Sequence, residues 1–259
     1  MELWSMGTWL AIALCGVAGV TLGLVGGGGS ILTTPILVFA AGLAPTTAVA
    51  LSLPVVGATS LVGAVLQARA GRVHYRAAAI LSAAGMVGAP LGALGTPRVP
   101  QPVLMGLFGL LMAVVGIRMA LGVEVKSPDD GGTCRPVVCA AAGLGIGVLT
   151  GFLGVGGGFL IVPVLLRFAR TPISLAVGTS LLIIATNSAV GTLGHLSELS
   201  GHTDLALALT AATIGGLAAG IRLGTRLQPR QARLAFAGVA VTVAAWVLAS
   251  QATPILKLL

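Results

Sequence analysis

Two glycine-rich runs, each closed by a proline, are the segments of this chain whose residues could bind a ligand. They are Gly23–Pro35 and Gly151–Pro163, and helices are predicted to start inside them, near Ser30 and near Phe159. A helix start presents unpaired N–H groups and the positive end of the helix dipole, and glycine lets a ligand approach them. The runs therefore predict an anion site that needs no buried lysine or arginine. We assign to it Gly26, Gly27, Gly28, Gly29, Ser30, Gly154, Gly156, Gly157 and Gly158.

Hydroxyls and one amide interrupt the apolar segment that follows each run, where a lipid-facing helix would carry leucine. Such groups need a hydrogen-bonding partner in a membrane interior. That partner is either a carbonyl of the same helix, which is common for Ser and Thr, or a substrate. Asn187 is the strongest candidate, because an amide demands several bonds. The predicted substrate-binding side chains are Ser52, Thr59, Ser60, Thr179, Ser180, Asn187 and Ser188.

Titratable side chains are sparse in the apolar segments, which contain no carboxylate except Asp204 at the start of 204–225. His195 and His202 are candidates for proton coupling, although a solvated interfacial cluster with Glu198 and Asp204 is the favoured interpretation. His74, among arginines, is expected to be solvated. Metal-binding spacing and a nucleophile–base pair are both missing, so we expect no enzyme, metal or cofactor. The cysteines, expected to be free thiols, are Cys15, Cys134 and Cys139.

The composition is that of a membrane protein. Of the 259 residues, 56% are hydrophobic and 8% are charged, and the apolar residues form long runs. A soluble chain of this length could not hide so much apolar surface, and β-barrel alternation is missing. The net charge of +8 comes from arginines in loops and reflects orientation in the membrane, not nucleic-acid binding. The expected partners are membrane lipid and a small-molecule anion; a homo-oligomer stays open.

The chain is an internal duplication with an offset of 128 residues, as between Gly26 and Gly154. Chance similarity between apolar sequences matches Leu and Ala, but here Gly, Pro, Ser, His and Arg match in one register. The predicted organisation is a first membrane repeat at 1–122, a cytoplasmic linker at 123–135 and a second repeat at 136–259. For the scattered glycines Gly85, Gly88 and Gly92 we expect close helix packing.

Ten apolar segments are expected, and the second of each half is too short to span a bilayer core of about 30 Å. In the first half they are 8–25, 30–43, 46–68, 75–96 and 101–121; in the second they are 136–153, 158–169, 173–196, 204–225 and 231–250. If the first two segments of each half return the chain to its starting side, all but Arg98 and Lys257 of the 14 Lys and Arg share one side. The positive-inside rule makes that side the cytoplasm, with both termini opposite.

An odd number of segments per half predicts inverted repeats. The fold class is therefore an all-α polytopic membrane protein of two homologous halves. Each half has a broken or re-entrant glycine-rich hairpin plus three spanning helices. Because the hairpins enter from opposite faces, their tips are expected to meet near the midplane. Whether they are re-entrant or fully spanning stays open.

The duplicated glycine runs, with Ser52-Leu-Pro-Val-Val-Gly and Gly178-Thr-Ser-Leu-Leu, resemble the sulfite exporter TauE/SafE family, also called the toluene-sulfonate uptake permease family. The resemblance covers nearly the whole chain and implies inner-membrane transport of sulfite, sulfonates or related anions. Family members are usually described with fewer membrane segments than expected here. We expect a secondary transporter for a small sulfur-containing oxyanion, foremost sulfite, that works by alternating access. An anion channel or passive pore is the alternative.

Overall fold

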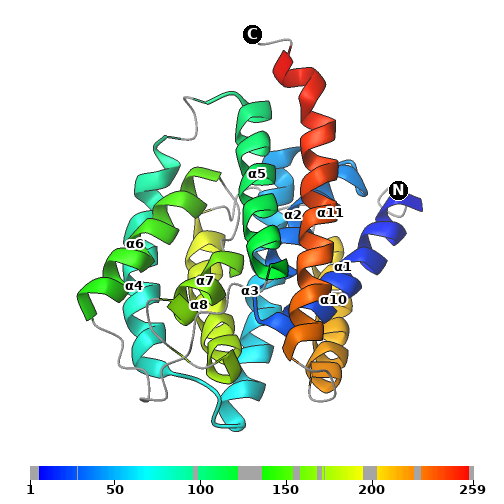
Figure 1. The fold of residues 1–259 in the computed structure, drawn as a ribbon. Coiled ribbons are helices and arrows are strands. Elements are labelled where there is room, and N and C mark those ends of the chain that lie inside the picture. Colours follow the sequence, from blue (N-terminus) through cyan, green and yellow to red (C-terminus); the bar gives the residue numbers. More distant parts are fainter. Residues whose placement is uncertain are drawn as a thin grey trace.

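The computed structural model describes residues 6–27, 29–95, 99–121, 136–153, 158–167, 171, 173–194, 203–224 and 229–256. Within these ranges the chain is helical with short connections and has no strand (Figure 1). The first half contains α1 Met6–Val25, α2 Gly29–Phe39, α3 Pro45–Arg69, α4 Tyr75–Ala93 and α5 Gln101–Ala120. The second half contains α6 Pro136–Leu153, α7 Gly158–Arg167, α8 Ile173–Leu193, α10 Thr203–Gly224 and α11 Pro229–Leu256.

These ten helices follow the ten apolar segments expected from the sequence. The second helix of each half is short, with 11 residues in α2 and 10 in α7. Both begin one residue earlier than the starts expected near Ser30 and Phe159, because Gly29 and Gly158 are already helical. The largest difference is in α11, which continues to Leu256 instead of ending near residue 250.

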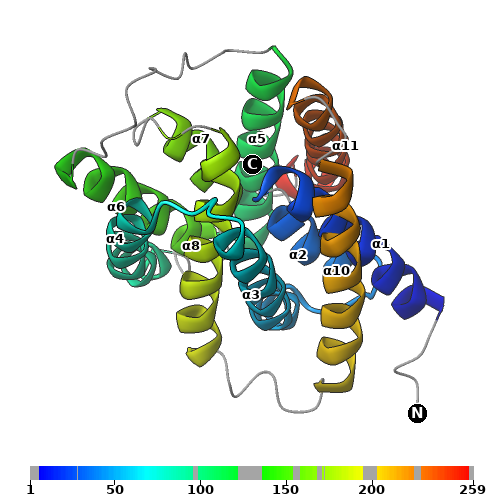
Figure 2. The same cartoon turned by 90° about the horizontal axis from the view of Figure 1, so that it is seen from below.

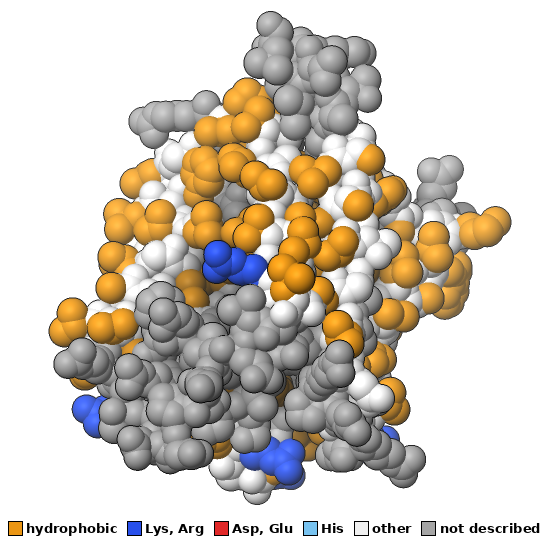
Figure 3. Space-filling view, in the orientation of Figure 1, with side chains coloured by type: hydrophobic (Ala, Val, Ile, Leu, Met, Phe, Trp, Pro, Cys, Tyr) orange, Lys and Arg blue, Asp and Glu red, His pale blue; other side chains and the backbone are white. Residues whose placement is uncertain are grey.

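Five of the described helices are long and apolar enough to cross a membrane: α1, α3, α4, α10 and the 175–193 part of α8. Their outer faces carry large exposed apolar side chains, such as Trp9, Val87 and Leu207, with exposed fractions of 58, 61 and 69%. Hydrophobic side chains cover much of the described surface in Figure 3. A soluble monomer rarely shows so continuous an apolar surface, whereas helices in lipid require one.

Two helix pairs are held together by glycines. Along α4 and α6, a Cβ added to Gly143 would lie 2.9 Å from the Leu81 carbonyl oxygen, and one added to Gly92 would collide with the Val148 carbonyl. Residue numbers rise together along this contact, so the helices run parallel. The close packing that we expected for Gly85, Gly88 and Gly92 is confirmed. A Cβ added to any of them would lie within 3.1 Å of an atom of α6 or α8. Close backbone contact of this kind maximises van der Waals attraction in lipid.

The α1 and α10 helices form the corresponding pair. Gly16 packs against Gly216, and a Cβ added to Gly23 would lie 2.5 Å from the Leu217 carbonyl oxygen. Here too the residue numbers rise together, so α1 and α10 are parallel. Each glycine-packed pair thus joins the first helix of one half to the fourth helix of the other.

The α3 and α8 helices cross between these two pairs (Figure 2). Gly57 packs on Ser188, whereas Gly63 packs on Leu181, so residue numbers rise along α3 as they fall along α8. The same holds for α5 and α11, where Gly109 faces Leu248 and Gly116 faces Val241 (Figure 1). Both of these pairs are therefore antiparallel.

The helix contacts keep the same pattern when the two halves are exchanged. Replacing each helix by its counterpart turns the α1/α10 pair into α6/α4, the α3/α10 contact into α8/α4 and the α2/α3 contact into α7/α8. The α3/α8, α5/α11 and α2/α7 pairs each map onto themselves. Helices from equivalent sequence positions therefore occupy equivalent places in the bundle.

The expectation that all three cysteines are free thiols is wrong, as Cys139 shows. Cys15 is free and buried in α1, but Cys139, near the start of α6, is disulfide-bonded. Sequence spacing missed this bond because cysteine arithmetic recognises metal and CxxC patterns, whereas a disulfide depends on the Cα separation in the folded chain. Cys134 lies outside the described residues.

Candidate functional site

The first glycine-rich turn is pressed against α8. Gly26 ends α1 with a φ of 78°, which favours glycine, and its N–H donates to the Leu22 carbonyl at 2.8 Å. Its own carbonyl accepts a hydrogen bond from the Ser180 hydroxyl at 2.6 Å. A Cβ on Gly26 would lie 2.7 Å from the Cα of Val177. The turn therefore needs glycine both for its backbone conformation and for its close approach to α8.

Gly27, just before α2, packs against Gly158, the first residue of α7. A Cβ added to Gly27 would lie 2.5 Å from the Gly158 carbonyl oxygen and 3.3 Å from Val162. Gly29, at the start of α2, is buried against Ala18 and Leu22 of α1. The starts of α2 and α7 are thus brought close together. Gly28, Gly154, Gly156 and Gly157 lie outside the described residues, as does the side chain of Ser30.

Two of the predicted polar side chains are used within the fold. Thr59 donates to the Val55 carbonyl of its own helix at 2.7 Å. Thr179 donates to the Leu175 carbonyl at 2.6 Å and accepts from the N–H of His74 at 2.9 Å. The Thr179 hydroxyl therefore joins α8 to the α3–α4 connection.

The repeat-related serines Ser52 and Ser180 also have partners. Ser52 donates to the Val49 carbonyl at 2.9 Å and accepts from Thr34 of α2 at 3.1 Å. Ser180 lies 2.8 Å from the Val177 carbonyl and 2.6 Å from that of Gly26. Ser52 thus links α3 to α2, and Ser180 links α8 to the turn at Gly26.

Three buried polar atoms have no hydrogen-bond partner in the described part of the chain: the hydroxyls of Ser60 and Ser188 and the Oδ1 of Asn187. Ser60 is fully buried and Ser188 is 2% exposed. These serines lie 128 residues apart in the sequence, on α3 and α8. A Cβ on Gly57, one turn before Ser60, would lie 3.1 Å from the Cβ of Ser188, so both belong to the α3/α8 crossing. A buried hydroxyl left unpaired costs about 1–3 kcal/mol, which a bound ligand could offset.

Asn187 lies next to Ser188 but faces α4. A Cβ on Gly85 would lie 3.1 Å from the amide nitrogen of Asn187. One residue earlier on α8, Thr186 shares a hydrogen bond of 2.9 Å with Ser82 of α4. The absence of a side chain at Gly85 therefore makes room for the amide between α4 and α8.

Charge is kept at the helix ends. The arginine side chains that the structure describes are all exposed, and Arg69, Arg72 and Arg76 surround the α3–α4 connection. No described Asp, Glu, Lys, Arg or His is buried, and the described residues contain no group of His, Cys, Asp and Glu that could hold a metal ion. An anion within this bundle would be held by neutral donors and helix dipoles. His195 and His202 lie outside the described residues.

Sequence reasoning missed the contribution of His74. We expected a solvated loop residue, but His74 is half-buried and caps α4, because its Nδ1 accepts from the Ala77 N–H at 3.1 Å. Its position directly before an apolar run was the available signal for a cap. Ser82, which pairs with Thr186, had no sequence signal, since a lone serine in a helix usually bonds to its own backbone.

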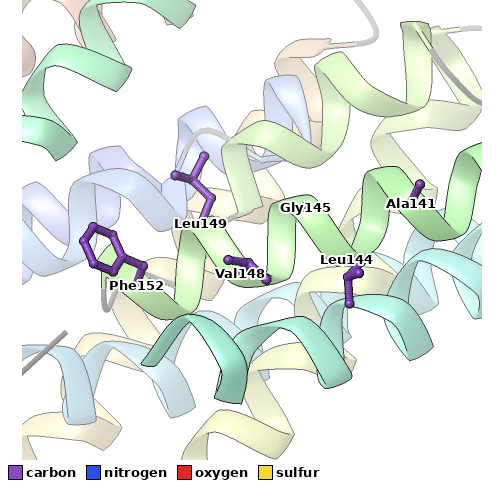
Figure 4. Close-up of a pocket in the computed structure, with 6 residues that line it drawn as sticks. All are labelled: Ala141, Leu144, Gly145, Val148, Leu149 and Phe152. Carbon is purple, nitrogen blue, oxygen red and sulfur yellow. The ribbon is translucent and has the colours of Figure 1, made fainter. Parts of the chain in front are cut away.

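An apolar hollow of about 500 Å³ lies along α6 (Figure 4). Its lining is Ala141, Leu144, Gly145, Val148, Leu149 and Phe152. Such a lining offers no side-chain hydrogen-bond donor to an anion. The candidate site is therefore the polar region of α3 and α8 together with the glycine-rich turns.

Comparisons with known proteins agree with this architecture. Residues 11–247 match the profile of the family described as Sulfite exporter TauE/SafE. The chain is 34% identical over 239 residues to a probable membrane transporter protein of Xylella fastidiosa, covering 90% of this chain and 92% of the relative. It is 26% identical to the probable membrane transporter proteins YunE of Bacillus subtilis and MJ0441 of Methanocaldococcus jannaschii, covering 82 and 86% of this chain and 85 and 88% of those relatives. No solved structure gives a significant match. The chain therefore belongs to the sulfite exporter TauE/SafE family of membrane transporters.

Proposed function

We propose that this protein is a secondary transporter that moves a small sulfur-containing oxyanion, either sulfite or an organosulfonate, across the bacterial inner membrane by alternating access. The observation that carries the proposal is the pair of repeat-related serines, Ser60 and Ser188, buried without a hydrogen-bond partner in the described chain beside the unpaired Oδ1 of Asn187. Neighbouring hydroxyls donate to carbonyls of their own helices, whereas these three atoms are free to form hydrogen bonds with a substrate. That the oxyanion contains sulfur is inferred from membership of the sulfite exporter TauE/SafE family.

The anion would be held without a buried cation. The N–H groups at the starts of α2 and α7 supply backbone donors, and the hydroxyls of Ser60 and Ser188 supply donors from side chains. Two helix starts provide about +0.5 elementary charge each, which suits an anion of low charge. The contact between Gly27 and Gly158 supports this arrangement, because it brings the two glycine-rich tips together. Ser52 and Ser180 hold the first hairpin in position.

Alternating access follows if the two halves are inverted repeats, here divided as 1–122 and 136–259. The antiparallel α3/α8 and α5/α11 pairs support inversion, because each pair consists of repeat counterparts. An axis that relates two antiparallel helices lies perpendicular to them, and hence in the membrane plane. The parallel α1/α10 and α4/α6 pairs, closely packed through glycine, are the units that would move as rigid bodies about α3 and α8.

The orientation proposed for the protein has the α3–α4 connection in the cytoplasm, with Arg69, Arg72 and Arg76. The linker at 123–135, which carries Lys126 and Arg135, is proposed to lie on the same side. In this orientation α1 approaches Gly26 from outside and α6 approaches its tip from the cytoplasm. A single cysteine replacing exposed Ala70, in a chain whose own cysteines are replaced by serine, should react with a membrane-impermeant maleimide only after the cytoplasmic face is opened.

Flux measurement in proteoliposomes tests the function. Wild type should show saturable sulfite uptake, and the double variant Ser60→Ala/Ser188→Ala should reduce it by at least about tenfold, the effect of losing about 1.4 kcal/mol of binding. Thr213→Val is the matched control, because Thr213 is equally buried but its hydroxyl bonds to its own helix at Leu209. Uptake that rises without saturation would favour a channel, and no protein-dependent uptake would overturn the proposal.

A further inference from the structure

The charge available to a bound anion is small. On α3, α4 and their connection, which pack against α8, the described charged or titratable side chains are Arg69, Arg72, His74, Tyr75 and Arg76. Of these, His74 is half-buried and the others are exposed, all around the α3–α4 connection. The starts of α2 and α7, as part of the site proposed above, would together contribute about one positive charge. A singly charged anion is therefore balanced, whereas a dianion would leave about one negative charge uncompensated, which is costly away from water.

The unpaired amide oxygen of Asn187 indicates, separately from the charge balance, which protonation form of the anion the site suits. The Oδ1 atom accepts hydrogen bonds and cannot donate them, and it is buried without a partner in the described part of the chain. A fully deprotonated oxyanion carries only acceptors, so it would place lone pairs against this oxygen. An oxyanion that keeps one acidic hydroxyl offers the donor that Oδ1 lacks, while its other oxygens accept from the hydroxyls of Ser60 and Ser188.

We propose that the site recognises the singly charged, hydroxyl-bearing form of an oxyanion, with its O–H donated to Asn187, and excludes the dianion. For a sulfur substrate this is hydrogensulfite, not sulfite dianion. The inference rests on the function proposed above. Its consequence is that each transported anion carries a proton, so the protein moves acid equivalents without using a titratable side chain in the membrane.

The direction of the pH change inside proteoliposomes separates net entry of hydrogensulfite from net entry of the dianion without a proton. Hydrogensulfite that enters a neutral lumen partly dissociates to sulfite dianion and a proton, so an enclosed pH indicator should report acidification. Entering dianion would instead take up protons and make the lumen alkaline. Valinomycin and potassium on both sides compensate the charge. Protein-free liposomes and Ser60→Ala/Ser188→Ala liposomes measure the acidification caused by sulfur dioxide that diffuses through lipid.

Competition experiments test the assignment of the hydroxyl to Asn187. Methanesulfonate is singly charged but has no O–H, and sulfate is a dianion at neutral pH. Wild type should prefer hydrogensulfite over methanesulfonate by about tenfold, the value of one hydrogen bond to a buried group, and should be unaffected by sulfate. Asn187→Leu should remove the preference over methanesulfonate, whereas Thr213→Val should keep it.

The outcomes distinguish this inference from the proposed function. Saturable sulfite uptake with lumenal alkalinisation, or with a rate that follows the dianion as external pH is raised, overturns the inference and leaves the function standing. A strict requirement for sodium overturns it as well, because sodium would then be the partner of the unpaired oxygens. If no saturable sulfite uptake occurs at any pH, the proposed function itself fails.

Discussion

Replacing Ser60 or Ser188 by alanine should stabilise the protein while it reduces transport. Each hydroxyl is buried and unpartnered in the described structure, and an unsatisfied buried polar group costs about 1–3 kcal/mol. Alanine removes only the oxygen, so the helix crossing loses almost no packing. Each single variant should therefore gain about 1 kcal/mol or more. The double variant should gain less than the sum, because both residues lie at the same crossing.

Ser180→Ala, in the same pair of helices, should change the stability of the fold in the opposite direction. Its hydroxyl donates to the Gly26 carbonyl, so alanine should destabilise the fold by about 1 kcal/mol and loosen the first glycine-rich turn. Thr213→Val should be close to neutral, because the acceptor of its hydroxyl, the Leu209 carbonyl, already lies within a helix. Stability can be measured by thermal unfolding of detergent-purified protein without substrate.

The order of the unfolding temperatures of these variants shows whether the Ser60 and Ser188 hydroxyls are unpaired. If Ser60→Ala and Ser188→Ala lower the unfolding temperature as much as Ser180→Ala does, both hydroxyls have partners and the premise of the site is wrong. If they raise it and transport is unchanged, the hydroxyls are buried defects without a role in binding. Higher stability with lower flux is the result expected of a site that holds its polar groups ready for a ligand.

Other predictions concern the glycines and the helix cap. Gly92→Ala should separate α4 from α6 and destabilise by more than about 1 kcal/mol, whereas Gly145→Ala on the open face of α6 should stabilise by about 0.5–1 kcal/mol, both read by thermal unfolding. Gly26→Ala should abolish sulfite flux, because Gly26 has a positive φ and the added Cβ would collide with α8. Gly42 also has a positive φ but faces open space, so Gly42→Ala should retain flux with slightly lower stability. His74→Ala should cost about 1 kcal/mol by loss of the α4 cap, and His74→Asn should restore most of it.

The helices could be predicted closely from the sequence. All ten apolar segments became helices, and the two short ones, α2 and α7, stayed short. Local signals suffice here, because apolar length and glycines that end a helix, such as Gly26 and Gly42, act within a few residues. The pairing of the helices could not be read in the same way. That α1 packs on α10 and α4 on α6 depends on glycine faces far apart in the sequence, and many glycines in apolar helices would fit equally.

For the candidate site, too, residue types could be predicted from the sequence, whereas their hydrogen-bond partners could not. The sequence by itself determined that glycine-rich runs and two serine pairs, Ser52/Ser180 and Ser60/Ser188, recur at an offset of 128 residues, and that one amide, Asn187, stands beside them. It could not separate Thr59 and Thr179, which are satisfied within the fold, from Ser60 and Ser188, which are unpaired in the described structure. That separation belongs to the tertiary structure, because the partner of a buried hydroxyl is set by its rotamer and by neighbouring helices. Residue type is local, whereas hydrogen-bond satisfaction is a property of the packed bundle.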